Sequence, residues 1–366
     1  MKYHRIVSVL LAAALLLSGC RSETEHPAPE TASGTAADTT ADSTALQTET
    51  TTLPSETTAP EPVRFTFNPH VYSPKLAQTI PQDHWDALYS LCDALRAGDS
   101  TFRCASQEAY DWVMDAAVLG HLCPAACMKI SGKSSDGTTP FENGTGRIYY
   151  NMPAADYVRR QAEFEQTVTD VLNSTLEADD DDFEKCLKLY RYIAANFFYE
   201  EFPAGCGDGA YYYTLMNHKG VCDELSGVYM YYLLQVGIDA LEIGCYADNM
   251  CHAWNYVILG GEGYHIDATW ALMSVYGTED LSLEYFMMTD EQRAFHDCPV
   301  DDLTVDLLPE YWANFSSLTF PATDGRYHAA DYSTLDSLDE TRKVMYYTDV
   351  GGESHELYYG EFRNPA

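Results

Sequence analysis

The chain has 366 residues, 46% of them hydrophobic, which is enough to bury a sizeable core in one large domain or two smaller ones. Its 56 acidic side chains against 21 lysines and arginines give a formal net charge of −35. Nucleic acid and anionic lipid surfaces repel such a chain, which argues against both as partners, although acidity alone names no substrate.

The first twenty residues are predicted to be an export signal that is not part of the fold. They contain Lys2 and Arg5, followed by an apolar run (6–17) that is too short to span a bilayer as a permanent helix. The run ends in Leu-Ser-Gly-Cys, which resembles a bacterial lipobox. This resemblance implies that Cys20 is lipidated and anchors the mature protein to the cell membrane, facing the extracytoplasmic side. A plain secretory signal is the alternative, and it also places the protein outside the cytoplasm.

Residues 21–64 are predicted to be a disordered linker. They include twelve threonines, four serines, eight acids and no aromatic residue. Ordering such a segment costs roughly 1–2 kcal/mol per residue, and there is little apolar surface to offset this loss. We therefore expect an extended tether that holds the folded part away from the membrane.

The N-terminal part of the folded region is predicted to be mainly helical. From Asp83 to Leu122, apolar residues recur at helical spacing. A passage rich in turn-forming residues follows at 131–146, and we predict a loop there between short strands, the second being RIYYN at 147–151.

Two further helices are predicted before the middle of the chain. The first covers about 157–176, and the second carries the apolar face of FEKCLKLYRYIAANF at 183–197. The acidic run at 179–182 precedes the second helix, where carboxylates accept unpaired N–H groups and suit the helix dipole. We interpret this run as a helix start and not as a calcium site, because no loop with ligand spacing follows it.

The segment KGVCDELSGVYMYYLLQV at 219–236 places Cys222 in the first turn of an apolar helix that ends before Gly237. Helix N-terminal N–H groups stabilise a thiolate and lower the pKa of a thiol. Asp223 and Glu224 are expected to oppose this effect with two negative charges. A reactive Cys222 would therefore need a further partner, and a histidine is the obvious candidate.

A hairpin downstream supplies that histidine and a carboxylate. The strands AWNYVIL (253–259) and YHIDATW (264–270) flank a glycine-rich turn. If the turn has two residues, His252 lies opposite Thr269, and Asp267 is its diagonal neighbour on the same face, about 7–8 Å away between Cα atoms. A longer turn would move them apart but keep them on one face. His265 points to the opposite face and is predicted to be structural or solvent-facing.

These three residue types suit nucleophilic catalysis. A thiol attacks a carbonyl as a thiolate, a histidine takes its proton and returns it to the leaving group, and a carboxylate fixes the imidazole tautomer. We therefore take Cys222 as candidate nucleophile, His252 as base and acid, and Asp267 as the orienting carboxylate.

The blocks Gly-Val-Cys (220–222), His-Ala-Trp-Asn (252–255) and Asp-Ala-Thr-Trp (267–270) together resemble the core of the transglutaminase-like superfamily. The resemblance runs from about Phe164 through 286–297. It implies a papain-like Cys, His, Asp triad in that chain order, with the cysteine helix packed on an antiparallel sheet.

The chain departs from the pattern after the cysteine. Many bacterial members have Glu-Gly-Tyr-Ala there, whereas this chain has Asp-Glu-Leu-Ser-Gly at 223–227, so the walls beside the thiol are expected to differ. The N–H of Cys222 is a natural oxyanion donor. The sequence does not choose a second oxyanion donor; the candidates are Tyr211, Tyr212, Tyr213 and Asn217. Another three residues could either brace the strands of the triad or touch the substrate, and we predict the bracing role for them: Trp254, Asn255 and Trp270.

The remaining cysteines allow several roles in an exported protein. A Cys245–Cys251 bridge could stiffen the segment before His252, and Cys186 lies on the apolar face of a helix, as a small core residue would. A zinc site from Cys245, Cys251 and His252 lacks paired CxxC spacing and would consume the base, so no metal or cofactor is predicted.

The sequence thus predicts an α+β fold with a transglutaminase-like core. The hypothesis is a lipid-anchored thiol enzyme that forms an acyl-enzyme thioester from a peptide or glutamine amide of a cell-wall or surface protein. Water would resolve it in a peptidase or deamidase, and an amine in a transglutaminase. One alternative is a catalytically silent binding or scaffold module. A solute-binding lipoprotein would show an α/β repeat, which is not seen.

The predicted parts are a signal peptide (1–20), a linker (21–64), a mainly helical region (65–155), a catalytic core (156–300) and a β-rich extension (301–366) with one hairpin around Gly351 and Gly352.

Overall fold

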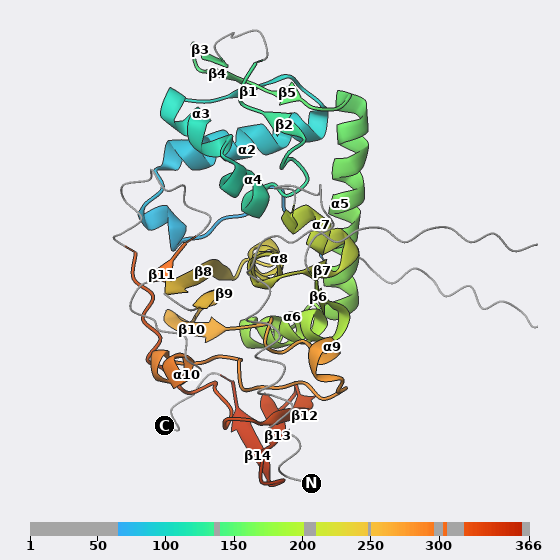
Figure 1. The fold of residues 1–366 in the computed structure, drawn as a ribbon, viewed down its shortest axis with the longest axis vertical. Helices are drawn as coiled ribbons and strands as arrows, with labels where there is room; N and C mark the ends of the chain where they lie inside the picture. The colour runs from blue at the N-terminus through green and yellow to red at the C-terminus, as the bar shows by residue number, and fades with distance from the viewer. Residues whose placement is uncertain are drawn as a thin grey trace, which may run out of the picture.

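The computed structural model describes residues 65–134, 140–200, 210–247, 250–295, 303–305 and 318–360. The predicted signal peptide with Cys20 and the predicted linker lie outside these residues. No helix in the described part of the chain is long and apolar enough to cross a membrane. The N-terminal helices lie at one end of an elongated molecule, an antiparallel sheet lies in the middle, and a second sheet forms the other end (Figure 1).

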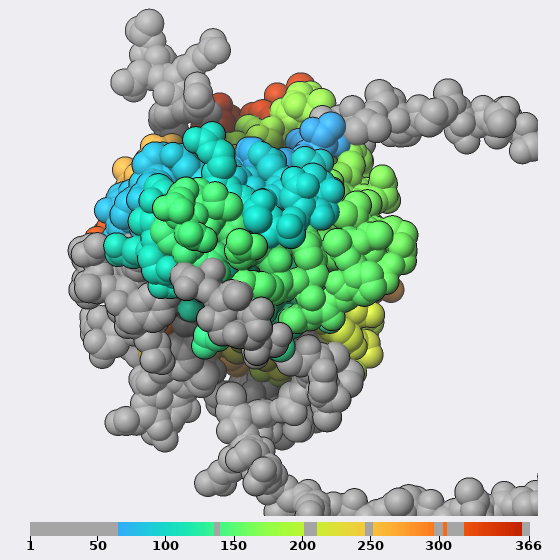
Figure 2. Space-filling view, turned by 90° about the horizontal axis from the view of Figure 1, so that it is seen from above, coloured from blue at the N-terminus to red at the C-terminus, as the bar shows by residue number. Residues whose placement is uncertain are grey.

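The N-terminal region is mainly helical, as predicted, but it is not one continuous helix. It contains the short 3-10 helix η1 (Leu76–Gln78) and three α-helices: α2 (Gln82–Ala97), α3 (Gln107–Val113) and α4 (Ala116–Leu122). The left-handed Gly98, with φ of 75°, ends α2, and strand β1 (Thr101–Arg103) separates it from α3. Together with α5, this region covers one end of the molecule (Figure 2).

Short strands follow α4, in agreement with the turn-rich composition of this segment. They are β2 (Ile130–Ser131), β3 (Phe141–Glu142), β4 (Thr145–Arg147) and β5 (Tyr149–Tyr150). Strands β1, β4 and β3 form one small sheet, and β2 pairs with β5. The expected loop therefore contains β3, and the RIYYN strand divides into β4 and β5.

Two longer helices follow the short strands. Helix α5 (Ala154–Thr175) lies along one side, and α6 (Asp182–Asn196) follows it near the central sheet (Figure 1). Asp181 caps α6 by accepting the Glu184 N–H, and the Glu184 side chain accepts the Asp181 N–H in return. The prediction that the acidic run begins this helix is confirmed.

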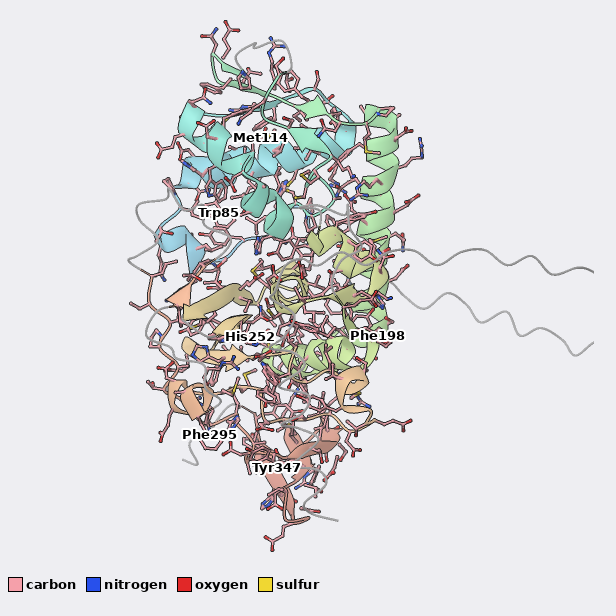
Figure 3. All side chains as sticks on the ribbon, viewed as in Figure 1. Trp85, Met114, Phe198, His252, Phe295 and Tyr347 are labelled. Atoms are coloured by element: carbon pink, nitrogen blue, oxygen red, sulfur yellow. The ribbon has the colours of Figure 1, made fainter. Side chains whose placement is uncertain are left out.

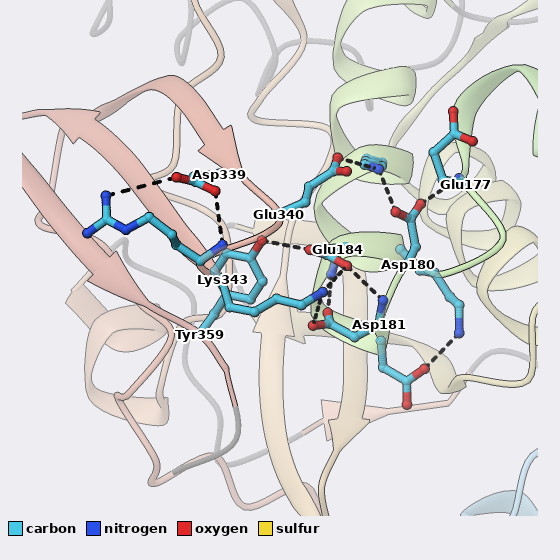
Figure 4. A network of polar contacts seen from close by, with 12 residues as sticks. Glu177, Asp180, Asp181, Glu184, Asp339, Glu340, Lys343 and Tyr359 are labelled. Carbon is cyan, nitrogen blue, oxygen red and sulfur yellow. Dashed lines mark hydrogen bonds and ion pairs between the residues drawn. The ribbon is translucent and has the colours of Figure 1, made fainter. Parts of the chain in front are cut away.

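The same acidic helix start holds the C-terminal sheet. Strands β12 (Thr334–Asp339), β13 (Val344–Thr348) and β14 (Ser354–Tyr358) form an antiparallel sheet, which contains the expected hairpin. Lys343 Nζ, between β12 and β13, lies 2.7 Å from Glu184 Oε2 and 3.0 Å from Asp181 Oδ2. The Tyr359 hydroxyl donates to Glu184 Oε1 at 2.7 Å (Figure 4). Two segments far apart in the chain are thus joined through one buried carboxylate.

The central sheet has the order β10–β9–β8–β11 and is antiparallel throughout. Its strands are β8 (Asp239–Ala247), β9 (Met250–Leu259), β10 (Glu262–Ile266) and β11 (Leu303–Thr304). Helix α8 (Cys222–Gln235) packs against β8 and β9 on one side and against α4, α6 and α7 (Ala210–Asn217) on others. Every residue of α8 from Glu224 onward is buried. The expectation of a single buried face was too narrow, because the surrounding helices enclose α8.

Three short elements complete the surroundings of the sheet. Strands β6 (Phe198–Tyr199) and β7 (Lys219–Gly220) pair in parallel ahead of α8, and this pairing had not been predicted. Helices α9 (Met273–Tyr276) and α10 (Asp290–Phe295) follow β10. The mixed helix and sheet composition agrees with the predicted α+β class.

Candidate active site

Cys222 is the first residue of α8 and is half-buried. The chain reaches it through β7, where Gly220 pairs with Tyr199 of β6. A Cβ at Gly220 would lie 2.7 Å from Thr214 Oγ1, so α7 packs against this turn too closely for any side chain. The glycine before the cysteine therefore allows α7, β7 and the start of α8 to meet in a small space.

The charge beside Cys222 differs from the expectation. The Glu224 side chain folds back on the helix start, where its Oε2 accepts the Val221 N–H at 2.9 Å. Burial first, and then the neighbouring Asp223, raise the pKa of Glu224 to about 9. Glu224 is therefore uncharged at neutral pH. The prediction that two carboxylates oppose a thiolate at Cys222 was wrong for Glu224.

His252 and Asp267 are in direct contact. His252 lies on β9, opposite Cys245 of β8, and its Nε2 is 2.7 Å from Asp267 Oδ2. His252 occupies the interior of the molecule beside β9 and β10 (Figure 3). The structure therefore brings together the two side chains that the hairpin pattern placed on one face.

The register that supports this contact was predicted only in part. Leu259 pairs with Glu262, as expected for a two-residue turn. However, β10 ends at Ile266, opposite Asn255, so His252 has no partner at Thr269. Asp267 is the first residue beyond the strand, where the chain turns, and its carboxylate reaches His252 from there.

The hydrogen on His252 can be assigned from its neighbours. Trp270 Nε1 lies 2.9 Å from the same Nε2 that contacts Asp267. One nitrogen cannot both donate to a carboxylate and accept from an indole N–H. Because Asp267 is ionised, we place the hydrogen on Nε2, donating to Oδ2, and regard the Trp270 ring as a cover for this bond. Nδ1 is then the nitrogen that can accept a proton from a thiol.

Asp267 is fully buried and closely surrounded by donors. Its Oδ1 accepts the backbone N–H groups of Thr269 at 3.1 Å and Trp270 at 3.3 Å. Arg293 Nη1 lies 3.0 Å from Oδ2. Burial raises the pKa of the Asp267 carboxyl, but His252 and Arg293 outweigh burial, and the net shift of this pKa is downward. The carboxylate is therefore ionised at neutral pH.

Arg293 is a functional candidate that the sequence did not reveal. It comes from α10, is fully buried, and its guanidinium lies over the Trp254 ring, 4.1 Å from the centroid. Its segment had been included in the family resemblance, but an arginine in a short acidic stretch usually faces solvent. Only the contact with Asp267 identifies its role.

A second buried group lies behind this arginine. Trp254 Nε1 donates to His265 Nδ1 at 3.1 Å, and His265 Nε2 lies 3.0 Å from Asp290 Oδ1. His265 is fully buried, which supports its predicted structural role. Burial lowers the pKa of His265, so it serves here as a neutral hydrogen-bonding bridge.

Asn255 braces the cysteine helix against the sheet. Its Nδ2 donates to the Ser226 carbonyl of α8 at 2.9 Å. Because Ser226 lies one helical turn beyond Cys222, this bond sets the position of α8 on β9. Trp254, Asn255 and Trp270 thus all make internal contacts, in line with the supporting role predicted for them.

Most candidates for a second oxyanion donor are engaged in packing. Asn217 Nδ2 donates to the Tyr213 carbonyl at 2.9 Å. The Tyr212 ring lies under Arg160, with the guanidinium carbon 3.2 Å from its centroid. The Tyr211 ring packs against α8 beside Gly227. The N–H of Cys222 remains the donor that its position at the helix start favours.

The DELSG departure faces mainly inward. Leu225, Ser226 and Gly227 are buried, so this part of the departure lies in the packing around α8, and the expectation of different walls beside the thiol stays a prediction. A Cβ at Gly227 would lie 2.1 Å from the Tyr211 ring and 2.8 Å from Glu242 Oε2. This glycine therefore allows α7 and β8 to approach α8.

The other cysteines can also be placed. Cys245 is fully buried, and Cys186 is a core residue, as predicted. The Cys245–Cys251 bridge stays a prediction, because it involves a side chain outside the described residues. Two cysteines, Cys206 and Cys298, and the side chain of Cys251 lie outside the described part of the structure.

Comparison with known proteins agrees with the predicted family. Residues 169–270 match the family model of the transglutaminase-like superfamily, and this span contains the candidate triad. No curated protein sequence matches the chain. A solved structure named "Putative Cysteine Protease from Cytophaga hutchinsonii" is 17% identical over 29% of this chain and 37% of that chain, with a TM-score of 0.26, which does not establish a shared fold. On the family match and the residues within it, the chain contains a domain of the transglutaminase-like superfamily.

Proposed function

We propose that this protein is a thiol acyltransferase or hydrolase in which Cys222 is the nucleophile, His252 the base and acid, and Asp267 the orienting carboxylate. The observation that carries the proposal is the buried 2.7 Å contact between His252 Nε2 and Asp267 Oδ2, on the sheet against which the Cys222 helix packs. An imidazole–carboxylate contact can also be structural, as that of His265 with Asp290 is, but the His252–Asp267 pair lies with Cys222 inside the span that matches the family. A thiol enzyme needs such a carboxylate to fix the tautomer and stabilise the imidazolium.

The first half of the proposed reaction forms a thioester. His252 Nδ1 takes the proton from Cys222 Sγ, and the thiolate attacks the carbonyl carbon of an amide, forming a C–S bond. The N–H of Cys222 stabilises the resulting oxyanion. The C–N bond then breaks, and His252 returns its proton to the departing ammonia or amine.

The second half releases the acyl group. Water or an amine attacks the thioester carbonyl while His252 accepts its proton, and the C–S bond breaks as the sulfur regains a proton from His252. Water yields a carboxylic acid, which is hydrolysis by a peptidase or deamidase. An amine yields a new amide, which is a cross-link.

The proposed substrate is a peptide or glutamine amide of a cell-wall or surface protein. The support for this is the predicted export signal with its lipobox, which would tether the enzyme through Cys20 on the extracytoplasmic face of the membrane. The strong negative charge of the chain favours neutral or basic substrate segments over acidic ones.

The deciding experiment incubates the purified full chain with a glutamine-containing peptide and a labelled amine. Incorporation of the amine indicates a transferase, and release of ammonia or peptide fragments without incorporation indicates a hydrolase. Cys222→Ala should abolish either product. Cys104→Ser, which removes a thiol from the N-terminal region, should not change the rate.

A second assay tests the triad without knowledge of the substrate. Iodoacetamide should modify Cys222 faster than it modifies a free cysteine at neutral pH, and His252→Ala should remove the difference. His355→Ala, in the C-terminal sheet, is the matched control. If Cys222 reacts only as fast as free cysteine and His252→Ala changes nothing, the enzyme proposal fails and a binding or scaffold module is the better description.

A further inference from the structure

The thiols of Cys92 and Cys123 are in direct contact, far from the candidate triad in the chain. Cys92 lies in α2, and Cys123 directly follows the last residue of α4. Their sulfur atoms are 2.9 Å apart, although the residues are 31 positions apart in the sequence. This is nearer than two unbonded sulfur atoms normally pack, and it exceeds the length of a disulfide bond, about 2.05 Å, by less than an ångström.

The other described thiols of this region have different surroundings. Cys104 Sγ donates to the Ser106 carbonyl at 3.2 Å, and Cys127 Sγ to the Ala116 carbonyl at 3.7 Å. Cys186 lies within the core. Within the described parts of the chain, Cys92 and Cys123 are thus the pair that the fold brings sulfur to sulfur.

One of the two thiols, that of Cys123, is partly exposed. Both cysteines line a small cavity of about 20 Å³, which is large enough to admit a water molecule, together with polar side chains that include Arg96 and Gln161. Cys123 is half-buried, and the Arg96 side chain is 43% exposed. Cys123 is therefore the thiol that would react first, because Cys92 is buried.

We propose that Cys92 and Cys123 form a disulfide when the protein meets a disulfide oxidant. The Cys123 thiolate attacks the oxidant, forming a mixed disulfide and releasing one thiolate. The contact with Cys123 and burial raise the pKa of the Cys92 thiol, so Cys92 gives up its proton as it attacks the Cys123 sulfur, forming the internal bond and releasing the second thiolate. The two cysteines lose two protons and two electrons in total, and the oxidant, a small-molecule or protein disulfide, takes up the electrons.

The bond would fasten α2 to the end of α4. Helix α4 packs against α7 and α8, so the cross-link would stiffen the helices around α8. It closes a long loop, which is the case in which a disulfide restricts the unfolded chain most. The proposal does not involve Cys222 and does not depend on the proposed function. The compartment predicted from the lipobox would favour the oxidised form.

The test uses the full chain, first reduced and then incubated with oxidised glutathione. Remaining thiols are blocked with N-ethylmaleimide, and the protein is digested without reductant for mass spectrometry. The expected result is a linked pair of peptides joining Cys92 to Cys123, two hydrogens lighter than the sum of the reduced peptides. Oxidation should also raise Tm by roughly 5–10 °C.

Cysteine-to-serine variants test whether Cys92 and Cys123 cause the linked peptides and the rise in Tm. Cys92→Ser and Cys123→Ser should each lose both the linked peptides and the rise in Tm, whereas Cys104→Ser should keep both. The proposal is overturned if both cysteines carry maleimide or separate glutathiones, or if either is linked to another cysteine. Linked peptides without a rise in Tm would establish the bond and overturn its stabilising role.

Discussion

Arg293 and Asp267 form an ion pair, 3.0 Å between Nη1 and Oδ2, that is buried behind the His252 imidazole. The same Oδ2 also contacts His252 Nε2 at 2.7 Å. His252 and Arg293 thus both contact Asp267 Oδ2, so removing either side chain leaves this buried oxygen with only the other of the two. This arrangement makes Arg293 a positioning residue that acts on the proposed base through Asp267.

Replacing Arg293 by methionine should destabilise the fold and shift the pH dependence of the reaction. Removing one partner of a buried ion pair costs about 3–5 kcal/mol. His252 and Arg293 lower the pKa of Asp267, so this carboxylate contributes stability above its unfolded pKa, which is lost as the pH falls. Without Arg293 this pKa rises, so the acidic limb of the pH–activity profile, where activity falls as Asp267 is protonated, should move to higher pH. Urea unfolding and the pH dependence of Cys222 alkylation measure the two effects.

Two further variants separate charge from structure. Arg293→Lys keeps the positive charge, so it should retain more activity at acidic pH than Arg293→Met does. Arg326→Met removes an arginine that pairs with Asp324 but is 57% exposed, so it should cost no more than about 1 kcal/mol. An unchanged acidic limb in Arg293→Met would contradict the positioning role.

Glu224→Gln should leave the protein intact at neutral pH and stabilise it at alkaline pH. The pKa of Glu224 is raised to about 9, so the folded state holds a proton that the unfolded state releases near pH 4.5. Stability from this group is complete below the unfolded pKa and falls as the pH rises toward 9. Glutamine is neutral and keeps an acceptor for the Val221 N–H, so the variant should lack this fall.

The measurement is Tm for the two proteins between pH 6 and pH 9.5. The Tm of Glu224→Gln should exceed that of the wild type by an amount that grows with pH. Glu163→Gln, in α5, is the matched control, because the same chemical change outside this helix start should not alter the slope. Parallel Tm curves for Glu224→Gln and wild type would show that Glu224 is charged in the folded protein.

Gly227→Ala should destabilise the protein, although alanine normally stabilises a helix by about 1 kcal/mol relative to glycine. The new methyl group would lie 2.1 Å from the Tyr211 ring, so α7 must move away from α8. Overpacking of this kind costs about 1–3 kcal/mol. Urea unfolding measures whether the free energy of unfolding falls or rises in the variant. A rise would show that α7 does not pack here.

Introducing Gly227→Ala into a Tyr211→Ala protein tests whether the Tyr211 ring causes the destabilisation. In a Tyr211→Ala protein the ring is absent, so adding Gly227→Ala should cost less than it does in the wild type. The difference between the two costs is the coupling energy between the positions. A coupling near zero would place the clash elsewhere, for example at Glu242, whose Oε2 would lie 2.8 Å from the same methyl group.

Lys343→Met should loosen the C-terminal sheet from α6. Burial raises the pKa of Glu184, but Lys343 and Tyr359 outweigh burial and the net shift of this pKa is downward, so Glu184 is a buried carboxylate that depends on both partners. Loss of the Lys343 ammonium should cost about 1–3 kcal/mol. Limited proteolysis should cut the C-terminal sheet sooner, and Arg342→Met, next to it and 60% exposed, should leave the cleavage rate unchanged.

Local patterns were enough for much of the fold. The acidic run before α6, the glycine after α8 and the paired glycines between β9 and β10 each mark an element boundary through backbone chemistry that depends on a few neighbouring residues. The alternation of side chains along a strand also placed His252 and Asp267 on one face, which allowed their contact but did not require it. The exact pairing did not follow from this pattern, because β10 ends at Ile266, where the chain turns away instead of continuing the ladder.

The sequence by itself thus determined the helix starts, the hairpin and the chain order of Cys222, His252 and Asp267, since these depend on residues close together in the chain. The tertiary structure decided the rest of the site: Arg293 reaches Asp267 from α10, Glu224 becomes neutral, and Cys92 meets Cys123. Each of these depends on which distant segments pack together and on how far water is excluded between them. Neither quantity is encoded in a local pattern, so only the packed fold reveals them.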